Sequence, residues 1–239
     1  MKKLVLLIFG CMAITPAWSI TFDYSNGHNT AIGLKLGMSS VPSLDFEIDG
    51  EYRPFRYLGA NVGFMYTTSL ENKTNKIGSN PSGDVLLWEI DGYKEASYRM
   101  AAKAGLQFTT PAIMLSKNEM GLSMRFSPGI TIPIPTNKVV TINNYQLVYE
   151  GEDETIDNLQ IKLISKEDYK NSGAKFCYWH ARVELVLEYE EQWEFSLGYT
   201  YSNLDLYGGS RSIEVHGSPL VIGKKEPMHC FNLGMTFKF

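Results

Sequence analysis

The stretch Phe231-Asn-Leu-Gly-Met-Thr-Phe-Lys-Phe239 alternates strictly between large apolar residues and small or polar ones. Successive side chains of a β-strand point to opposite faces, so one face of this segment is wholly apolar. Chain ends usually fray in water, and a soluble protein therefore rarely ends on its most hydrophobic strand. The segment predicts a terminal strand with one face against lipid or a hydrophobic core. That face consists of Phe231, Leu233, Met235, Phe237 and Phe239.

The same alternation recurs upstream and predicts seven more strands, over residues 32–38, 44–53, 58–67, 98–108, 122–132, 179–189 and 193–202. Their apolar faces carry no Asp, Glu, Lys or Arg, while their polar faces mix charges with glycines such as Gly33, Gly63 and Gly129. A soluble sandwich would show mostly long charged residues on its polar face, whereas small residues suit a narrow interior. Aromatic residues gather near the strand ends, as in the interfacial girdles of membrane barrels. The pattern favours an all-β, closed antiparallel transmembrane β-barrel of eight strands.

Of the connections between the predicted strands, three odd ones are long and two even ones are tight turns. The odd connections are residues 39–43, 68–97, 135–174 and 203–227, and the even ones are 54–56, 109–120 and 190–192. Outer-membrane barrels keep short turns in the periplasm and long loops outside, so we expect extracellular long loops and periplasmic termini. In the third loop, Leu159, Ile161 and Leu163 alternate with polar residues. We interpret this segment as a hairpin above the membrane. The alternative is a ten-stranded barrel that uses it as two spanning strands.

The N-terminus supports export. Lys2 and Lys3 precede an apolar stretch over residues 4–14, and Ala17-Trp-Ser19 supplies a small-x-small cleavage site. The stretch is shorter than the roughly 20 residues of a membrane helix, so it predicts a signal peptide over residues 1–19. The barrel domain would then span residues 20–239. The sequence Ile8-Phe-Gly-Cys11 resembles a lipobox, which leaves lipidation at Cys11 as an alternative.

Composition narrows the function classes. Removing the two signal-peptide lysines leaves 20 basic against 26 acidic residues, a net charge near −6 that argues against nucleic-acid binding. The two remaining cysteines, Cys177 and Cys230, fall on opposite faces of non-adjacent predicted strands. We therefore predict free thiols. Without Cys/His spacing typical of zinc, we predict no metal site and no cofactor.

The strands, the loop lengths and the terminal Phe239 together resemble the small OmpA/OmpX-like family of bacterial outer-membrane barrels, often labelled porin family. The resemblance covers the whole mature chain and implies a cell-surface protein in a Gram-negative outer membrane. It also implies that the terminal apolar face is an assembly signal read by the barrel-assembly machinery. We expect this strand to pair with residues 32–38 and 193–201. Outer-membrane lipids and an extracellular ligand or surface are the expected partners of a monomer.

Charged residues dominate the predicted lumen face. An eight-stranded barrel has an interior just wide enough for side chains, and unpaired buried charges cost several kcal/mol each. Seven acidic against seven basic residues therefore predict a network of ion pairs that plugs the barrel. The predicted network is Lys35, Asp45, Glu47, Asp49, Glu51, Arg99, Lys103, Arg125, His180, Arg182, Glu184 and Lys238, and Arg53, Glu188 and Glu194 complete the lumen row.

Two other patterns contain residue types that occur in metal-binding or catalytic sites. The acidic row from Asp45 to Glu51 is either a cation site or a ladder of ion pairs with Lys35, Arg99 and Lys103, and we favour the ladder. His216 and Ser218, with Glu214 nearby, contain the residue types of a lipid hydrolase but lack its surrounding motif. We therefore assign no catalytic residue. The predicted function is a structural or surface-interaction role through the loops. A narrow channel for small solutes is the alternative, and a lipid-modifying enzyme is the third hypothesis.

Overall fold

The computed structural model describes residues 29–55, 57–70, 76–79, 87–91, 98–115, 120–135, 138–149, 159–170, 175–215, 218–220 and 225–239. The predicted signal peptide and the lipidation candidate Cys11 lie outside these ranges. Across the same ranges, no helix is both long enough and apolar enough to span a bilayer.

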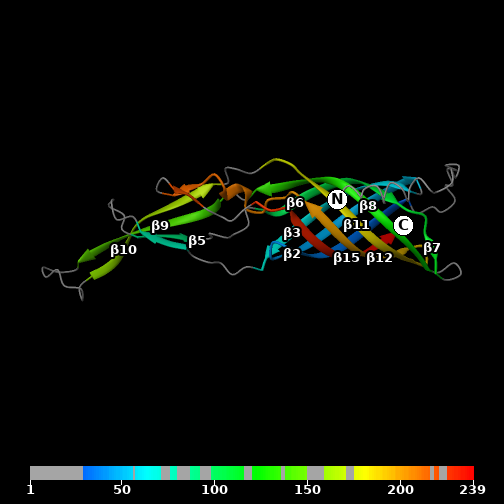
Figure 1. Ribbon diagram of the computed structural model, residues 1–239, viewed down its shortest axis with the longest axis horizontal. Coiled ribbons are helices and arrows are strands. Elements are labelled where there is room, and N and C mark those ends of the chain that lie inside the picture. Colours follow the sequence, from blue (N-terminus) through cyan, green and yellow to red (C-terminus); the bar gives the residue numbers. More distant parts are fainter. Residues whose placement is uncertain are drawn as a thin grey trace.

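A closed barrel forms the larger part of the molecule (Figure 1). Each strand pairs antiparallel with its neighbours, and β11 pairs with β8 to close the sheet on itself. This arrangement confirms the predicted eight-stranded barrel. Its strands are β1 (Thr30–Ser39), β2 (Ser43–Phe55), β3 (Leu58–Ser69), β6 (Tyr98–Thr109), β8 (Met120–Pro135), β11 (Tyr178–Tyr189), β12 (Trp193–Ser202) and β15 (Met228–Lys238).

The terminal strand β15 closes the barrel between the first strand and the seventh. Leu34 lies opposite Met235 in the pairing of β1 with β15, and Phe195 lies opposite the same residue on β12. The predicted partners of the terminal strand are therefore confirmed. Phe239 adds a last contact, because its backbone N–H donates to the Thr30 carbonyl at 2.9 Å.

The two ends of the barrel differ. At the turn end, β2 connects to β3 and β11 to β12 through tight turns, and β6 leads through a two-residue strand β7 (Ile113–Met114) into β8. The opposite end, here called the loop end, carries the connections that follow β1, β3, β8 and β12. Three of the four connections at the loop end are long, and two of the three at the turn end are tight turns, as the sequence indicated.

A second sheet projects beyond the loop end along the long axis of the molecule (Figure 1). It contains β4 (Lys76–Ser79), β5 (Leu87–Asp91), β9 (Lys138–Tyr149) and β10 (Leu159–Lys170), in the order β10-β9-β5-β4. We call it the projecting sheet. β9 pairs with β10 on one side and with β5 on the other, and neither β9 nor β10 pairs with a barrel strand. The predicted hairpin is therefore confirmed, and the ten-stranded alternative is wrong.

The wall of the barrel is apolar outside and polar inside. Leu34 and Leu36 on β1 are 52% and 46% exposed, whereas Lys35 between them is 5% exposed. A soluble protein would bury these leucines and expose the lysine, because burial of apolar surface drives folding in water. The reversed pattern fits a barrel surrounded by lipid.

The β6 strand departs from the predicted alternation at its start. Tyr98 pairs with Pro135 and Met100 with Ile134, so Arg99 is an extra residue in the ladder and forms a β-bulge. Tyr98 and Ala101 consequently point inward, and Arg99 is exposed on the outer surface. The prediction that Arg99 belongs to the lumen network is wrong, because a strictly alternating pattern cannot anticipate the bulge.

The remaining described elements belong to the connection between β12 and β15. They are a short 3-10 helix η2 (Gly208–Ser210) and a two-stranded ladder of β13 (Glu214–Val215) with β14 (Ser218–Pro219). Cys177 is exposed and Cys230 is buried, and both are free thiols as predicted.

Candidate functional site

The lumen is filled by a ladder of ion pairs that runs along the barrel axis. Toward the loop end, the Glu47 carboxylate on β2 accepts hydrogen bonds from Lys103 Nζ and Arg182 Nη2, both at 2.6 Å. Lys103 comes from β6, two strands from β2, and Arg182 comes from β11, on the opposite wall, so the second contact crosses the barrel.

Lys35 occupies the middle of the ladder. Its Nζ lies 3.1 Å from Asp49 Oδ2 and 3.6 Å from Glu184 Oε1, and Glu51 Oε1 is at 4.0 Å. All four side chains are at most 3% exposed. A buried cation of this kind is stabilised only by carboxylates that remain beside it, because water no longer solvates it.

Toward the turn end, Arg125 is the centre of the network. Its guanidinium pairs with Glu194, and Nη1 lies 3.5 Å from Glu51 and 3.9 Å from Glu184. Arg53 also contacts two of these carboxylates, donating from Nη1 to Glu194 at 2.5 Å and pairing with Glu51. Arg125, itself 1% exposed, therefore contacts three carboxylates from three strands.

The ladder ends at Lys238, whose ammonium pairs with Glu188 and lies 3.4 Å from Glu194. The structure thus places nine of the predicted network residues in ion pairs that cross the lumen. They are Lys35, Glu47, Asp49, Glu51, Lys103, Arg125, Arg182, Glu184 and Lys238.

The other predicted members behave differently. His180 is buried, and its Nδ1 is 2.9 Å from Thr131 Oγ1. Asp45 is buried beside Ser43 Oγ and Cys230 Sγ, each at 3.4 Å, and among the described residues it has no basic group within ion-pair distance. With Arg99 outside, the lumen row holds seven acidic against six basic residues, and the predicted exact balance is not met.

Glycines on the lumen face make room for this network. A Cβ atom added at Gly129 would lie 2.5 Å from the Ala104 carbonyl oxygen and 2.8 Å from the His180 ring. One added at Gly234 would lie 2.5 Å from Ser196 Oγ and 3.0 Å from Lys35 Cγ. Small residues are therefore required where the chain passes closest to neighbouring side chains and backbone.

An apolar layer closes the lumen at the loop end. The Tyr98 and Tyr178 rings pack edge to face with centroids 6.4 Å apart, and their hydroxyls are 3.4 Å apart. Leu204 and Leu206, from the connection after β12, pack in one buried cluster with side chains from the strands and are 2% and 3% exposed. We call this cluster the apolar plug. Its members are Met65, Tyr98, Ala101, Tyr178, Leu204, Leu206 and Met228.

The connection that carries the plug also packs against the projecting sheet. Asp205, 6% exposed, accepts hydrogen bonds from Arg211 at 2.5 and 3.0 Å, which folds this segment back on itself. Just beyond, a second hydrophobic core joins the segment to β5 and β9. Its buried members are Ile90, Val140, Ile142, Ile213, Val215 and Leu220. Plug and sheet are therefore held together by one connection.

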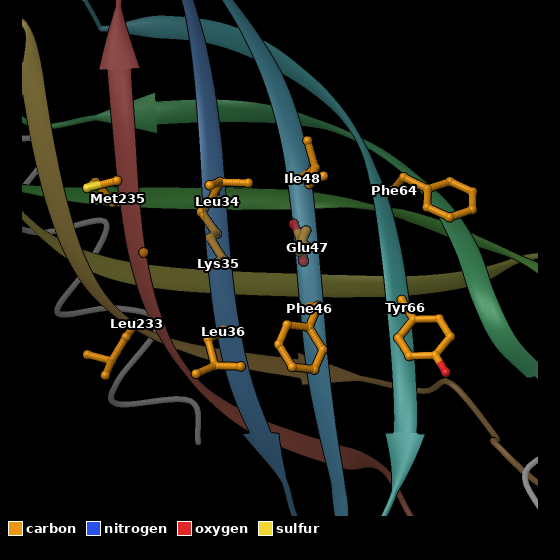
Figure 2. Close-up of a pocket in the computed structure, with 11 residues that line it drawn as sticks. Leu34, Lys35, Leu36, Phe46, Glu47, Ile48, Phe64, Tyr66, Leu233 and Met235 are labelled. Atoms are coloured by element: carbon orange, nitrogen blue, oxygen red, sulfur yellow. The ribbon is translucent and has the colours of Figure 1, made fainter.

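The outer wall is hydrophobic and has a shallow hollow of about 560 Å³ over β15, β1, β2 and β3. Figure 2 shows Leu34, Leu36, Phe46, Ile48 and Phe64 on this outer side, with Lys35 and Glu47 behind the ribbon on the lumen side. The hollow is open and apolar, and we interpret it as wall surface that lipid chains fill.

No group of three or more His, Cys, Asp or Glu residues suited to a metal ion occurs in the described part of the chain. Most carboxylates of the acidic row on β2 form ion pairs, so the row is a ladder and not a cation site. The basic partners are Lys35, Lys103, Arg53, Arg125 and Arg182, and Arg99 is not among them. Of the hydrolase candidates, Glu214 is exposed, while His216 and the Ser218 side chain lie outside the described residues.

Comparison with known proteins finds relatives only at the level of fold. No protein-family model and no curated protein matches the chain. Among solved structures, Neisserial surface protein A matches with a TM-score of 0.40 at 8% identity, covering 88% of this chain and 96% of that one. The N-terminal β-barrel domain of Pseudomonas aeruginosa OprF matches with a TM-score of 0.38 at 7% identity, covering 89% of this chain and 98% of that one.

A third match is Ail, the attachment invasion locus protein of Yersinia pestis. It has a TM-score of 0.33 at 10% identity, covering 88% of this chain and 96% of Ail. The chain is similar to small bacterial outer-membrane barrels. The assignment of the fold itself rests on the strand pairing described above.

Proposed function

We propose that the protein is a closed outer-membrane barrel that anchors the projecting sheet at the cell surface, where the sheet contacts a partner. The single observation that carries this proposal is the filled lumen, in which an ion-pair ladder and an apolar plug lie in series. In the proposed orientation the loop end is extracellular and both termini are periplasmic, because outer-membrane barrels place their longer connections outside.

A channel needs a continuous aqueous path, whereas among the described residues the ladder and the plug both place packed side chains in the lumen. Opening the ladder would strand buried charges, which costs several kcal/mol for each broken pair. Opening the apolar plug would expose Leu204, Leu206 and two tyrosines to water. The role proposed here uses no catalytic residue.

Planar-bilayer recording tests the closed lumen. Refolded protein, shown by a heat-modifiability gel to be a barrel, is expected to give no discrete conductance steps above the baseline of protein-free bilayers. The reason is that the ladder and plug must both open before ions pass. Reproducible steps in proportion to inserted protein would contradict the proposal and favour the narrow channel.

We also propose that the terminal apolar face directs assembly. Deleting Phe239 removes one exposed aromatic and the hydrogen bonds between its backbone and Thr30, but it leaves the lumen ladder intact. We expect folded barrel in cell outer membranes to fall several-fold, while refolding into detergent is little changed. Quantitative blotting of heat-modifiable protein measures both. Equal losses in cells and in detergent would indicate a stability defect and not a lost signal.

A further inference from the structure

One connection contributes to both hydrophobic clusters at the loop end. Residues 203–215, which follow β12, supply Leu204 and Leu206 to the apolar plug, and they supply Ile213 and Val215 to the second hydrophobic core beside β5 and β9. Figure 1 shows this part of the chain in orange, between the barrel and the projecting sheet. We call residues 203–215 the plug segment. It is a direct link between the sheet outside and the lumen inside.

The plug segment is buried although most of it is irregular. Six of the seven residues from Leu204 to Ser210 are buried, and Tyr207 is the exception. Connections usually run over a protein surface, because their backbone groups need water or another partner. Here partners lie within the segment itself. The N–H of Gly208 donates to the Asp205 carbonyl and that of Ser210 to the Tyr207 carbonyl, both at 3.0 Å. These hydrogen bonds travel with the segment, which can therefore move as one body.

Apolar contacts hold the two ends of the plug segment. At the barrel end, Leu204 and Leu206 pack in the plug, and Gly208 lies against the tyrosine pair beneath it. A Cβ atom added at Gly208 would lie 3.1 Å from the hydroxyl oxygens of both Tyr98 and Tyr178. At the other end the segment packs in the second hydrophobic core. Burial of apolar surface stabilises both ends, so opening the second core removes part of what keeps the segment in place.

A buried thiol lies directly beneath the plug. Cys230 is 2% exposed and follows the plug residue Met228 by two positions on β15, so both side chains face the lumen. Its Sγ donates to Asp45 Oδ2 at 3.4 Å. Thr200 lies opposite Cys230 on one side and opposite Arg182 on the other, which puts the thiol level with the loop-end ion pairs of the ladder. A reagent that arrives from the loop end therefore meets the plug before it meets this thiol.

We propose that the plug segment is a conformational link through which the projecting sheet controls access to the lumen. While the second hydrophobic core is intact, the sheet holds the plug in the barrel mouth. When this core opens, the segment moves away as one body, and water and small solutes reach the lumen as far as Cys230. The ladder stays closed, because its residues belong to neither hydrophobic cluster. The inference rests on the proposed function, since it describes how the same closed lumen is regulated.

Thiol labelling of Cys230 tests this link. The full-length protein carries Cys177→Ser, which removes the exposed thiol, and is refolded in detergent. A small cationic methanethiosulfonate is added, and peptide mass spectrometry measures the rate of labelling at Cys230. We expect Ile213→Asp with Val215→Asp to raise this rate at least tenfold, because an apolar core does not tolerate ionised carboxylates.

Two further variants calibrate the measurement. Leu204→Ser with Leu206→Ser loosens the plug itself and should also raise the rate at least tenfold, which gives the value for an open mouth. Ile77→Asp is the matched control, because it adds the same charge to the projecting sheet at a residue that is 70% exposed. It should change the rate less than twofold. Heat-modifiability gels establish that each variant is a folded barrel.

Hydrogen exchange of the unmodified protein tests the same link, and it decides the question if the aspartate variant does not fold. Segments that open together share one opening event and exchange with the same protection. We expect residues 204–215 and residues 140–142 to show protection factors within threefold of each other, with the same response to low urea. The barrel strands β12 and β15 should exchange at least tenfold more slowly.

Three results would overturn the inference. They are an unchanged labelling rate in the aspartate variant, an equal rise in Ile77→Asp, and exchange of residues 204–206 only together with the barrel strands. None of them bears on bilayer recordings of the unmodified protein. Discrete conductance there would refute the proposed function, whereas silent recordings with unchanged labelling would refute the link alone.

Discussion

Replacing Arg125 with methionine is expected to destabilise the barrel by about 3–5 kcal/mol. Methionine keeps much of the side-chain volume but removes the cation that Glu51, Glu184 and Glu194 share. Arg53 and Lys238 would still contact Glu194, yet Glu184 would keep only Lys35 among the ion-pair partners found here. Arg125 is 1% exposed, so water cannot take the place of the lost charge.

Urea titration of the barrel refolded into lipid vesicles measures this effect through tryptophan fluorescence. Lys175→Met is the control, because Lys175 is exposed at the loop end and its loss should shift the unfolding free energy by less than about 0.5 kcal/mol. If the two variants unfold at the same urea concentration, Arg125 is not a structural centre of the ladder.

Gly129→Ala is expected to destabilise the barrel by about 1–3 kcal/mol, the usual range for an overpacked core. The added methyl would lie 2.5 Å from the Ala104 carbonyl oxygen, and this backbone atom is held in place by the ladder between β6 and β8. The neighbouring His180 ring, 2.8 Å away, is hydrogen-bonded to Thr131 and restricts relief on the other side.

Gly50→Ala is the matched control for this substitution. Gly50 is also a strand glycine, but a Cβ there points outward and has only the Val62 carbonyl oxygen near it, at 4.0 Å. Its variant should be neutral within about 0.5 kcal/mol. The same urea titration compares the two, and equal destabilisation would show that loss of glycine flexibility, not crowding of the lumen, governs both.

The two-residue alternation of apolar and polar side chains was sufficient to predict the barrel, because each spanning strand has one face against lipid and one against the lumen. The alternation of apolar and polar residues therefore shows which face each side chain occupies. Leu34 and Phe46 lie outside, and Lys35 and Glu47 lie in the lumen. The same regularity produced the error at Arg99. A single bulged residue changes the phase of the alternation, so Tyr98 and Arg99 depart from the predicted faces while Lys103 and the residues after it keep them. The cause is pairing with Pro135 and Ile134 on a distant strand.

The projecting sheet was predicted only in part. The β9–β10 hairpin left a local trace in the alternation around Ile161, but β4 and β5 are short strands inside a long connection. They are strands because β5 pairs with β9, for example Ile90 with Ile142, far away in the sequence. The apolar plug was not predicted either. Leu204 and Leu206 look like ordinary loop residues until the fold brings them over the barrel mouth.

The projecting sheet is assembled from segments that the barrel keeps apart in sequence. β5 lies between β3 and β6, β9 lies between β8 and β11, and the core over them includes Ile213 and Val215 from the connection after β12. These three connections meet only when the strands beneath them have taken their final neighbours. Since contacts between distant segments form late in folding, the sheet should mature after the barrel has closed. A chain that has not yet inserted into the membrane would therefore lack the assembled sheet and could not bind a partner through it.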